Sequence, residues 1–263
     1  MKGVKKILAN IKKYYKYAIY SSKSELKSEV ATSYLNWLWW ILDPLCFMMI
    51  YTFIVEIVFK TKEQYLPVFV FIGLTTWNFF NKIVSQSTKL IVNNKSIVSK
   101  VYIPKYILLL SKSFTILFKT MISFALILVL MVVFKVPFSL KMLYFVLILI
   151  PLYLISFGIG SILMHYGVFV EDLSPTTNIV LKLVFYLSGI FYNINSRIPY
   201  PYSHILLNGN PISFLMNEFR NIFIYNTSPN FIYLGIWTFI GACLSLIGML
   251  AINKYENSYV KVI

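Results

Sequence analysis

Long apolar runs dominate the sequence and restrict the chain to a membrane. Six stretches are apolar over the length that a helix needs to cross a bilayer, about 20 residues, or over nearly that length. Hydrophobic residues make up 59% of the 263 residues and charged residues 13%, whereas soluble domains carry about a quarter charged residues. We therefore predict an all-α integral membrane protein whose single domain covers 1–263.

The positions of the basic residues indicate how the chain is threaded. The six transmembrane helices are predicted at 35–59, 66–84, 114–134, 142–166, 179–194 and 231–252. Segments 1–34, 85–113 and 253–263 hold eight, five and two Lys and Arg, and the three loops on the opposite side hold two each. Since cytoplasmic loops are enriched in Lys and Arg, we expect both termini to be cytoplasmic. A six-span bundle would then cover 35–252, followed by a cytoplasmic tail over 253–263.

The N-terminal segment 1–34 is predicted to form an amphipathic helix that lies on the cytoplasmic membrane surface. At about 100° per residue its apolar side chains fall within an arc of roughly 140°. This arc contains Val4, Ile7, Leu8, Ile11, Tyr14, Tyr15, Ala18 and Ile19. Lysines cover the other side, which is typical of interfacial helices. The net charge of +15 lies between apolar segments, so we expect anionic lipids as partners and no nucleic acid.

The region before the last span differs from a plain loop. The fifth apolar run is short, and Asn210 and Pro211 after it suit the N-cap and first turn of a helix. Apolar residues recur at helical spacing through 210–223, a segment that also carries Glu218 and Arg220. We predict a re-entrant helical segment that dips into the outer leaflet, and an extracellular surface loop is the alternative.

Motifs for catalysis are missing from this sequence. No G-x-x-x-x-G-K-[ST] is present, so the chain has no P-loop to hold nucleotide phosphates. No H-E-x-x-H, G-x-S-x-G or paired carboxylate set occurs, and the two Cys have no second ligand at metal-binding spacing. We therefore predict no catalytic residues, no metal site and no cofactor in this chain.

An acid and several aromatic residues in the spans are candidates for a transport path. Asp43 lies about 12 Å into the first span and should face the protein interior or a wet cavity, because exposure to lipid is costly; capping at a helix end is the alternative. Trp clusters usually mark the membrane interface, but aromatic faces also stack on sugar rings. The candidate substrate path consists of Trp37, Trp40, Asp43, Tyr51, Trp77, Phe80 and Phe191.

Two polar stretches on the cytoplasmic side interrupt the apolar pattern. Residues 85–105 mix apolar and basic side chains and are too polar to span a membrane, and 167–178 is the acidic cytoplasmic loop. Either stretch could contact a partner protein or be a solvated connector.

The order of motifs resembles the permease subunits of ABC-2 type exporters, in the branch that exports polysaccharides, O-antigens and teichoic acids. The resemblance covers nearly the whole chain. It rests on Glu25-Leu26-Lys27, Ser33-Tyr34-Leu35, Trp40 to Leu45, Phe69 to Leu74, Trp77 to Phe80, Ile91 to Asn94, Lys100 to Lys105, Gly167-Val168-Phe169, Asp172-Leu173, Asn210-Pro211 and Phe219-Arg220. Three positions depart from the family pattern: Glu29 and Glu171 stand near positions that are often basic, and Asn36 replaces a common glycine.

The resemblance implies a homodimer joined to two copies of a separate nucleotide-binding ATPase, which would bind ATP and Mg. The cargo would be a lipid-linked glycan, and the location the bacterial plasma (inner) membrane. The ATPase-coupling residues would be Asn93, Lys95, Lys100, Tyr102, Pro104, Lys105, Gly167, Glu171 and Asp172, and the exit segment would include Asn210, Pro211, Glu218 and Arg220. Two alternatives stay open: an ABC-2 exporter of small hydrophobic drugs or lipids, and a membrane-embedded glycan-modifying enzyme.

Overall fold

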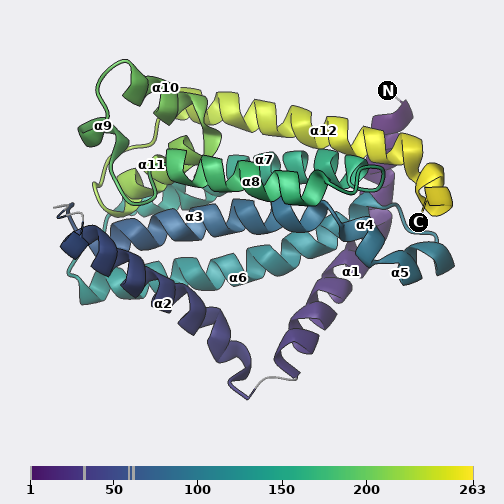
Figure 1. The fold of residues 1–263 in the computed structure, drawn as a ribbon, viewed down its shortest axis with the longest axis horizontal. Coiled ribbons are helices and arrows are strands. Elements are labelled where there is room, and N and C mark those ends of the chain that lie inside the picture. Colours follow the sequence, from purple (N-terminus) through teal and green to yellow (C-terminus); the bar gives the residue numbers. More distant parts are fainter. Residues whose placement is uncertain (1, 32–33, 59, 61–62, 263) are drawn as a thin grey trace.

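The protein is described by a computed structural model that covers residues 2–31, 34–58, 60 and 63–262. Every regular element in these ranges is a helix (Figure 1). The elements are α1 Lys2–Ala31, η1 Asn36–Leu38, α2 Trp39–Phe53, η2 Ile54–Val58, α3 Leu66–Ser87, α4 Leu90–Asn93, α5 Lys95–Lys100, α6 Tyr106–Val133, η3 Leu140–Tyr144, α7 Phe145–Tyr166, α8 Leu173–Leu187, α9 Ile194–Arg197, α10 Tyr202–Gly209, α11 Pro211–Phe223 and α12 Phe231–Val262. The predicted all-helical class is confirmed.

Five of the helical stretches are long and apolar enough to cross a membrane in the described part of the chain. They are Trp39–Val58, Leu66–Ser87, Tyr106–Val133, Leu140–Tyr166 and Phe231–Tyr259. The predicted fifth span at 179–194 corresponds instead to α8, which has 15 residues and ends at Leu187. Gly189 follows with a φ of +66°, a backbone conformation that favours glycine and does not continue a helix. The sixth crossing therefore stays a prediction.

Two helices extend beyond their predicted ends. α6 begins at Tyr106, just after Pro104, and includes Lys112 before the apolar run starts. α12 continues through the predicted tail to Val262. The predicted bounds came from hydropathy, which indicates only the part of a helix that can lie in lipid. The helix itself continues into polar residues until its backbone hydrogen bonding is interrupted, and a nearby proline is one cause of such an interruption.

Helix α3 lies at the centre of the bundle. Most of its side chains are buried, and Phe69, Phe71 and Phe79 are at most 1% exposed. It contacts α2, α6, α7 and α11.

The close pairing of α7 and α12 depends on small residues. A Cβ at Gly158 would lie 2.7 Å from Leu244 Cβ, and one at Gly241 would lie 2.9 Å from Leu154 Cβ. Small residues allow helices to approach closely in membranes. The glycines therefore permit the close contact between α7 and α12.

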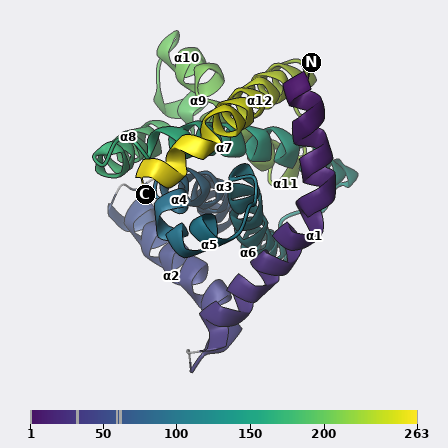
Figure 2. The ribbon, with the colours of Figure 1, turned by 90° about the vertical axis from the view of Figure 1, so that its right-hand side faces the viewer.

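The two ends of the bundle carry different elements. Figures 1 and 2 show α4, α5 and both chain termini at one end, whereas α9 and α10 lie at the other.

Helix α1 runs along the edge of the bundle and packs against α6 and α12. Its predicted apolar arc divides into two parts. Ile7 and Ala18 are buried against the bundle, whereas Leu8 and Tyr15 are exposed.

Candidate functional site

The two polar stretches 85–105 and 167–178 meet in one cleft of about 550 Å³ at the end of the bundle that carries the termini. We call it the coupling cleft. Its lining consists of Thr88, Lys89, Val92, Asn93, Lys95, Gly167, Val168, Phe169, Val170, Glu171 and Ser174. Four of the predicted coupling residues, Asn93, Lys95, Gly167 and Glu171, therefore come together although they belong to separate loops.

Gly167 explains why the two loops lie so close. A Cβ at this position would collide with the backbone carbonyl of Thr88, so only glycine allows the turn after α7 to contact the end of α3. Gly167 thus brings the two walls of the coupling cleft together, and its part in ATPase coupling stays a prediction.

The remaining predicted coupling residues lie outside the coupling cleft. Lys100 and Asp172 are exposed, and Asp172 is the N-cap residue of α8. Pro104 is buried, and Lys105 is only 4% exposed. Burial lowers the pKa of Lys105, and the charge of Glu256 partly offsets that effect. Lys105 therefore does not present its charge to a partner in this structure, contrary to what its place in the motif suggested.

Glu256 connects three segments at the same end and was missed by the sequence analysis. Tyr102 donates a hydrogen bond of 2.8 Å to Glu256 Oε1, and Lys6 Nζ lies 3.9 Å from the same oxygen. This hydrogen bond raises the pKa of Tyr102. Glu256 is only 7% exposed. It joins α12 to α1 and to the linker before α6, a contact that the predicted cytoplasmic tail at 253–263 gave no reason to expect.

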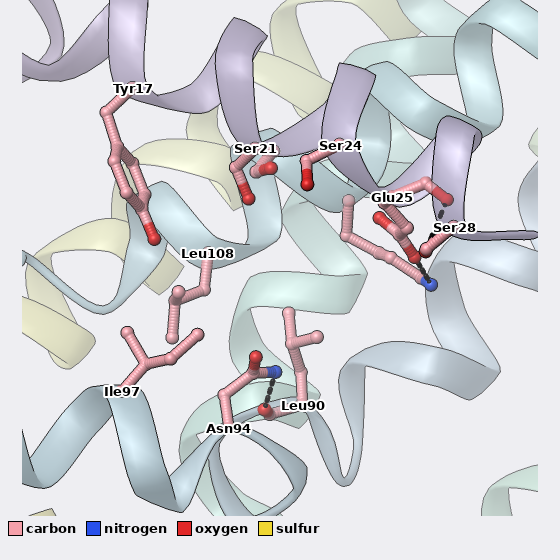
Figure 3. Close-up of a pocket in the computed structure, with 11 residues that line it drawn as sticks. Tyr17, Ser21, Ser24, Glu25, Ser28, Leu90, Asn94, Ile97 and Leu108 are labelled. Atoms are coloured by element: carbon pink, nitrogen blue, oxygen red, sulfur yellow. Dashed lines mark hydrogen bonds and ion pairs between the residues drawn. The ribbon is translucent and has the colours of Figure 1, made fainter.

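A polar pocket of about 350 Å³ lies between α1, the α4–α5 segment and α6 (Figure 3). Lys112 pairs with Glu25, and Thr115 Oγ1 donates to Glu25 Oε2 at 2.9 Å. Glu29 pairs with Lys119 in the same way. Glu29 departs from the family pattern, and here it is matched by a lysine on α6.

The predicted substrate path is divided between two places. Trp40 and Asp43 line a cavity of about 100 Å³ together with Lys82 and Lys119. Asp43 is otherwise exposed on the outside of α2, so its place in a substrate path stays a prediction. Trp37 is 57% exposed before α2 begins.

The second group of path residues lies between α2, α3 and the α8 region. The rings of Tyr51 and Phe191 are 4.6 Å apart. Trp77 and Phe80 are 5% and 6% exposed, and Trp77 packs against Phe185 of α8. The two residues are therefore buried packing groups in this structure and do not line an open path.

A polar stripe on α3 was also missed. Its members, partly or fully exposed on a helix that is otherwise buried, are Asn78, Asn81, Lys82, Ser85 and Gln86. We call them the α3 polar stripe. The spacing of three and four residues places them on one helix face, a periodicity that is present in the sequence but is obscured by the apolar length of the span.

At the opposite end, Asn210 caps α11 as predicted. Its Oδ1 accepts hydrogen bonds from the backbone N–H groups of Ile212 at 3.0 Å and Ser213 at 3.4 Å, and Pro211 occupies the first turn. Its side-chain N–H donates to Ser188 Oγ at 2.9 Å. The side chain therefore starts α11 and ties it to the end of α8.

The two charged residues of α11 are buried. Glu218 is 3% exposed and accepts a hydrogen bond of 3.0 Å from the N–H of Asn230. Arg220 is 4% exposed and donates to the carbonyls of Gly189 at 2.9 Å and Ile190 at 2.8 Å. Both side chains hold neighbouring segments in place and do not face an open exit.

Arg220 occupies space that a glycine leaves free. The guanidinium lies over the Phe69 ring at 3.4 Å from its centroid. A Cβ at Gly73 would lie 2.8 Å from Arg220 Nη2 and 3.1 Å from the Ile190 carbonyl oxygen. Gly73 of α3 therefore makes the buried Arg220 contacts possible.

In the described ranges, no three His, Cys, Asp or Glu side chains form a group that could hold a metal ion.

The sequence is similar to known membrane proteins. An O-antigen export system permease protein RfbA from Klebsiella pneumoniae is 27% identical over 243 residues, which cover 92% of this chain and 93% of that protein. A protein of the same name from Myxococcus xanthus is 27% identical over 207 residues, 78% of this chain and 79% of that protein. The family model described as ABC-2 type transporter matches residues 20–224. The chain therefore belongs to the ABC-2 type transporter family.

Proposed function

We propose that this chain is the permease subunit of an ATP-driven exporter that moves a lipid-linked polysaccharide outward across the bacterial plasma membrane. Membership of the ABC-2 type transporter family and the likeness to O-antigen export permeases over nearly their full length support the proposal. The permease would act as a homodimer with two copies of a separate ATPase subunit, which would bind ATP and Mg.

The single observation that carries the proposal is the coupling cleft. Two loops that are far apart in the sequence, 88–95 and 167–174, form one concave surface. A motor subunit that binds there would contact both loops at once, and a movement of one ATPase could shift α3 and α7 together. The excess of Lys and Arg near the chain termini supports a cytoplasmic position for this end.

The exposed apolar residues of α1 support an interfacial position of that helix. Leu8 is 61% and Tyr15 43% exposed, and these side chains would enter the bilayer while the lysines stay at the headgroups. For α11, the cap at Asn210 and the largely buried helix support a re-entrant segment, since helical backbone satisfies its own hydrogen bonds at membrane depth.

The α3 polar stripe favours a hydrophilic cargo. Asn78, Asn81, Ser85 and Gln86 can both donate and accept hydrogen bonds, which suits the hydroxyl groups of a sugar chain. A small hydrophobic drug would gain nothing from these groups, so the polysaccharide is preferred over the apolar cargo. The stripe runs from the cavity at Asp43 towards the coupling cleft, where α3 ends.

Reconstituted vesicles would test the proposal. Permease and its ATPase are inserted together with a fluorescent lipid-linked glycan, and exposure of the glycan is followed with an enzyme that cuts it from one side only. We expect exposure that requires ATP and both subunits. Conversion of the glycan by the permease alone would instead show an enzyme, and ATP-driven movement of hydrophobic dyes without the glycan would show a drug or lipid exporter.

A further inference from the structure

An apolar groove of about 730 Å³ separates the second half of α1 from α6. We call it the α1–α6 groove. Its lining consists of Ile19, Ser22, Lys23, Leu26, Lys27 and Val30 of α1, Trp40 of α2, and Phe114, Leu117, Phe118 and Met121 of α6. Its volume is that of a site for a sizeable small molecule.

The groove offers almost no hydrogen-bonding groups. Besides the two lysines and Trp40, Ser22 is the polar residue of the lining. Its hydroxyl already donates to the Ile19 carbonyl at 2.8 Å. A sugar or a peptide backbone placed here would lose its hydrogen bonds to water without replacement, which is costly. A hydrocarbon chain has no such loss. Phe118 at 49% exposed and Ile19 at 40% exposed leave apolar surface that a hydrocarbon chain would cover.

Two lysines border the groove, and neither has an acidic partner among the residues that the structure describes. Lys23 and Lys27 are exposed and one turn apart on α1, so their side chains share one face. The two acids of this segment are engaged elsewhere, because Glu25 pairs with Lys112 and Glu29 pairs with Lys119 of α6. In the described part of the chain no carboxylate lies within ion-pair distance of either Lys23 or Lys27. The rim of the groove is therefore positively charged.

We propose that the α1–α6 groove binds one anionic phospholipid of the surrounding bilayer. An acyl chain would lie between Leu26 and Phe118, and the phosphate would lie against Lys23 and Lys27. Such a lipid would fill the gap between α1 and α6 and add to the two ion pairs that join these helices. The proposal depends on the apolar lining and the unpaired lysines, and it does not require that the exported cargo is a glycan.

Native mass spectrometry of the purified full-length chain tests the proposal, with phosphatidylglycerol and phosphatidylcholine of identical acyl chains as the probes. We expect one phosphatidylglycerol to be retained in preference to phosphatidylcholine. The double variant K23Q/K27Q should lose the preference by about thirty-fold, since each lysine at an anionic surface contributes about five-fold, equivalent to about 1 kcal/mol.

Two further variants separate this site from general attraction. K12Q/K16Q removes the same charge from exposed positions of α1 outside the groove and should keep the bound lipid. Phe118→Gln keeps both lysines but places an amide in the groove, and it should lose the lipid. Thermal unfolding confirms that each variant is folded.

Three results would overturn the proposal. They are equal retention of the two phospholipids by the unaltered chain, equal losses in K23Q/K27Q and K12Q/K16Q, and undiminished binding in Phe118→Gln. The lipid bound to the chain is also identified after purification from cells that produce the glycan. If the lipid displaced by K23Q/K27Q is the lipid-linked glycan and not phosphatidylglycerol, the groove binds the cargo and the proposal is wrong.

Discussion

Replacing Gly73 by alanine should destabilise the permease although alanine is the better helix former. The new Cβ would lie 2.8 Å from Arg220 Nη2 and 3.1 Å from the Ile190 carbonyl oxygen. The guanidinium must then move away from the carbonyl to which it donates at 2.8 Å. The overpacking costs about 1–3 kcal/mol, and the lost charged hydrogen bond costs about 1.5–3 kcal/mol.

These costs are partly offset because alanine is favoured over glycine in a helix by about 1 kcal/mol. The net loss of unfolding free energy for Gly73→Ala should therefore be about 1.5 to 5 kcal/mol. Gly235→Ala is the matched control, since Gly235 lies in α12 and a Cβ there would meet nothing within 4 Å. That variant should be unchanged or more stable by up to about 1 kcal/mol.

Reversible unfolding in mixed detergent micelles, followed by circular dichroism, measures these differences. A double-mutant cycle with Arg220→Ala isolates the contact between the two side chains. With the guanidinium removed, the cost of alanine at position 73 should fall by about 1.5–3 kcal/mol. A steric conflict between the new Cβ at position 73 and Arg220 is refuted if Gly73→Ala is as stable as Gly235→Ala, or if the loss of unfolding free energy on Gly73→Ala is the same with and without Arg220.

Three further predictions concern the coupling end. Lys100→Glu should uncouple ATP hydrolysis from export without changing thermal stability, because Lys100 is exposed; unchanged export in vesicles would count against a coupling role. Burial lowers the pKa of Lys105, so the unfolded chain binds this proton more tightly than the folded chain. Stability should therefore rise with pH between the lowered pKa and the ordinary value near 10.4, and Lys105→Met should flatten that rise in a pH series of unfolding curves. Gly167→Ala should push the turn after α7 away from Thr88, with a cost of about 1–3 kcal/mol. It should also weaken co-purification of the ATPase, which a pull-down with equal amounts of folded permease would detect.

The spans and the helix cap were predictable because each depends on local patterns. The lengths of the apolar runs gave α2, α3, α6, α7 and α12, and the Asn210-Pro211 pair gave the start of α11. A membrane span depends on one continuous apolar run of about 20 residues, and a helix cap depends on a few neighbouring residues. Both patterns can therefore be recognised in a single sequence.

The contacts between distant segments were not predictable in this way. Glu256 and Tyr102 are 154 positions apart, and no spacing rule connects them. Arg220 was expected near an exit, yet its guanidinium is buried against carbonyls of the chain after α8. Lys105 was expected among the ATPase-coupling residues from its place in the motif, yet only 4% of its surface is exposed. The burial and partners of these side chains depend on which helices pack together, and local sequence patterns do not specify that packing.

Photo-crosslinking from the coupling cleft in cells tests the central claim most directly. A photoreactive amino acid is placed at Asn93 or Glu171, and for comparison at Tyr200 on the opposite end of the bundle, where it is 83% exposed. Crosslinks to the ATPase subunit should form from Asn93 and Glu171 and not from Tyr200. Crosslinks from Tyr200 alone, or labelling of Glu171 by a membrane-impermeant reagent added outside the cell, would contradict the claim that this cleft is the cytoplasmic docking surface for the ATPase.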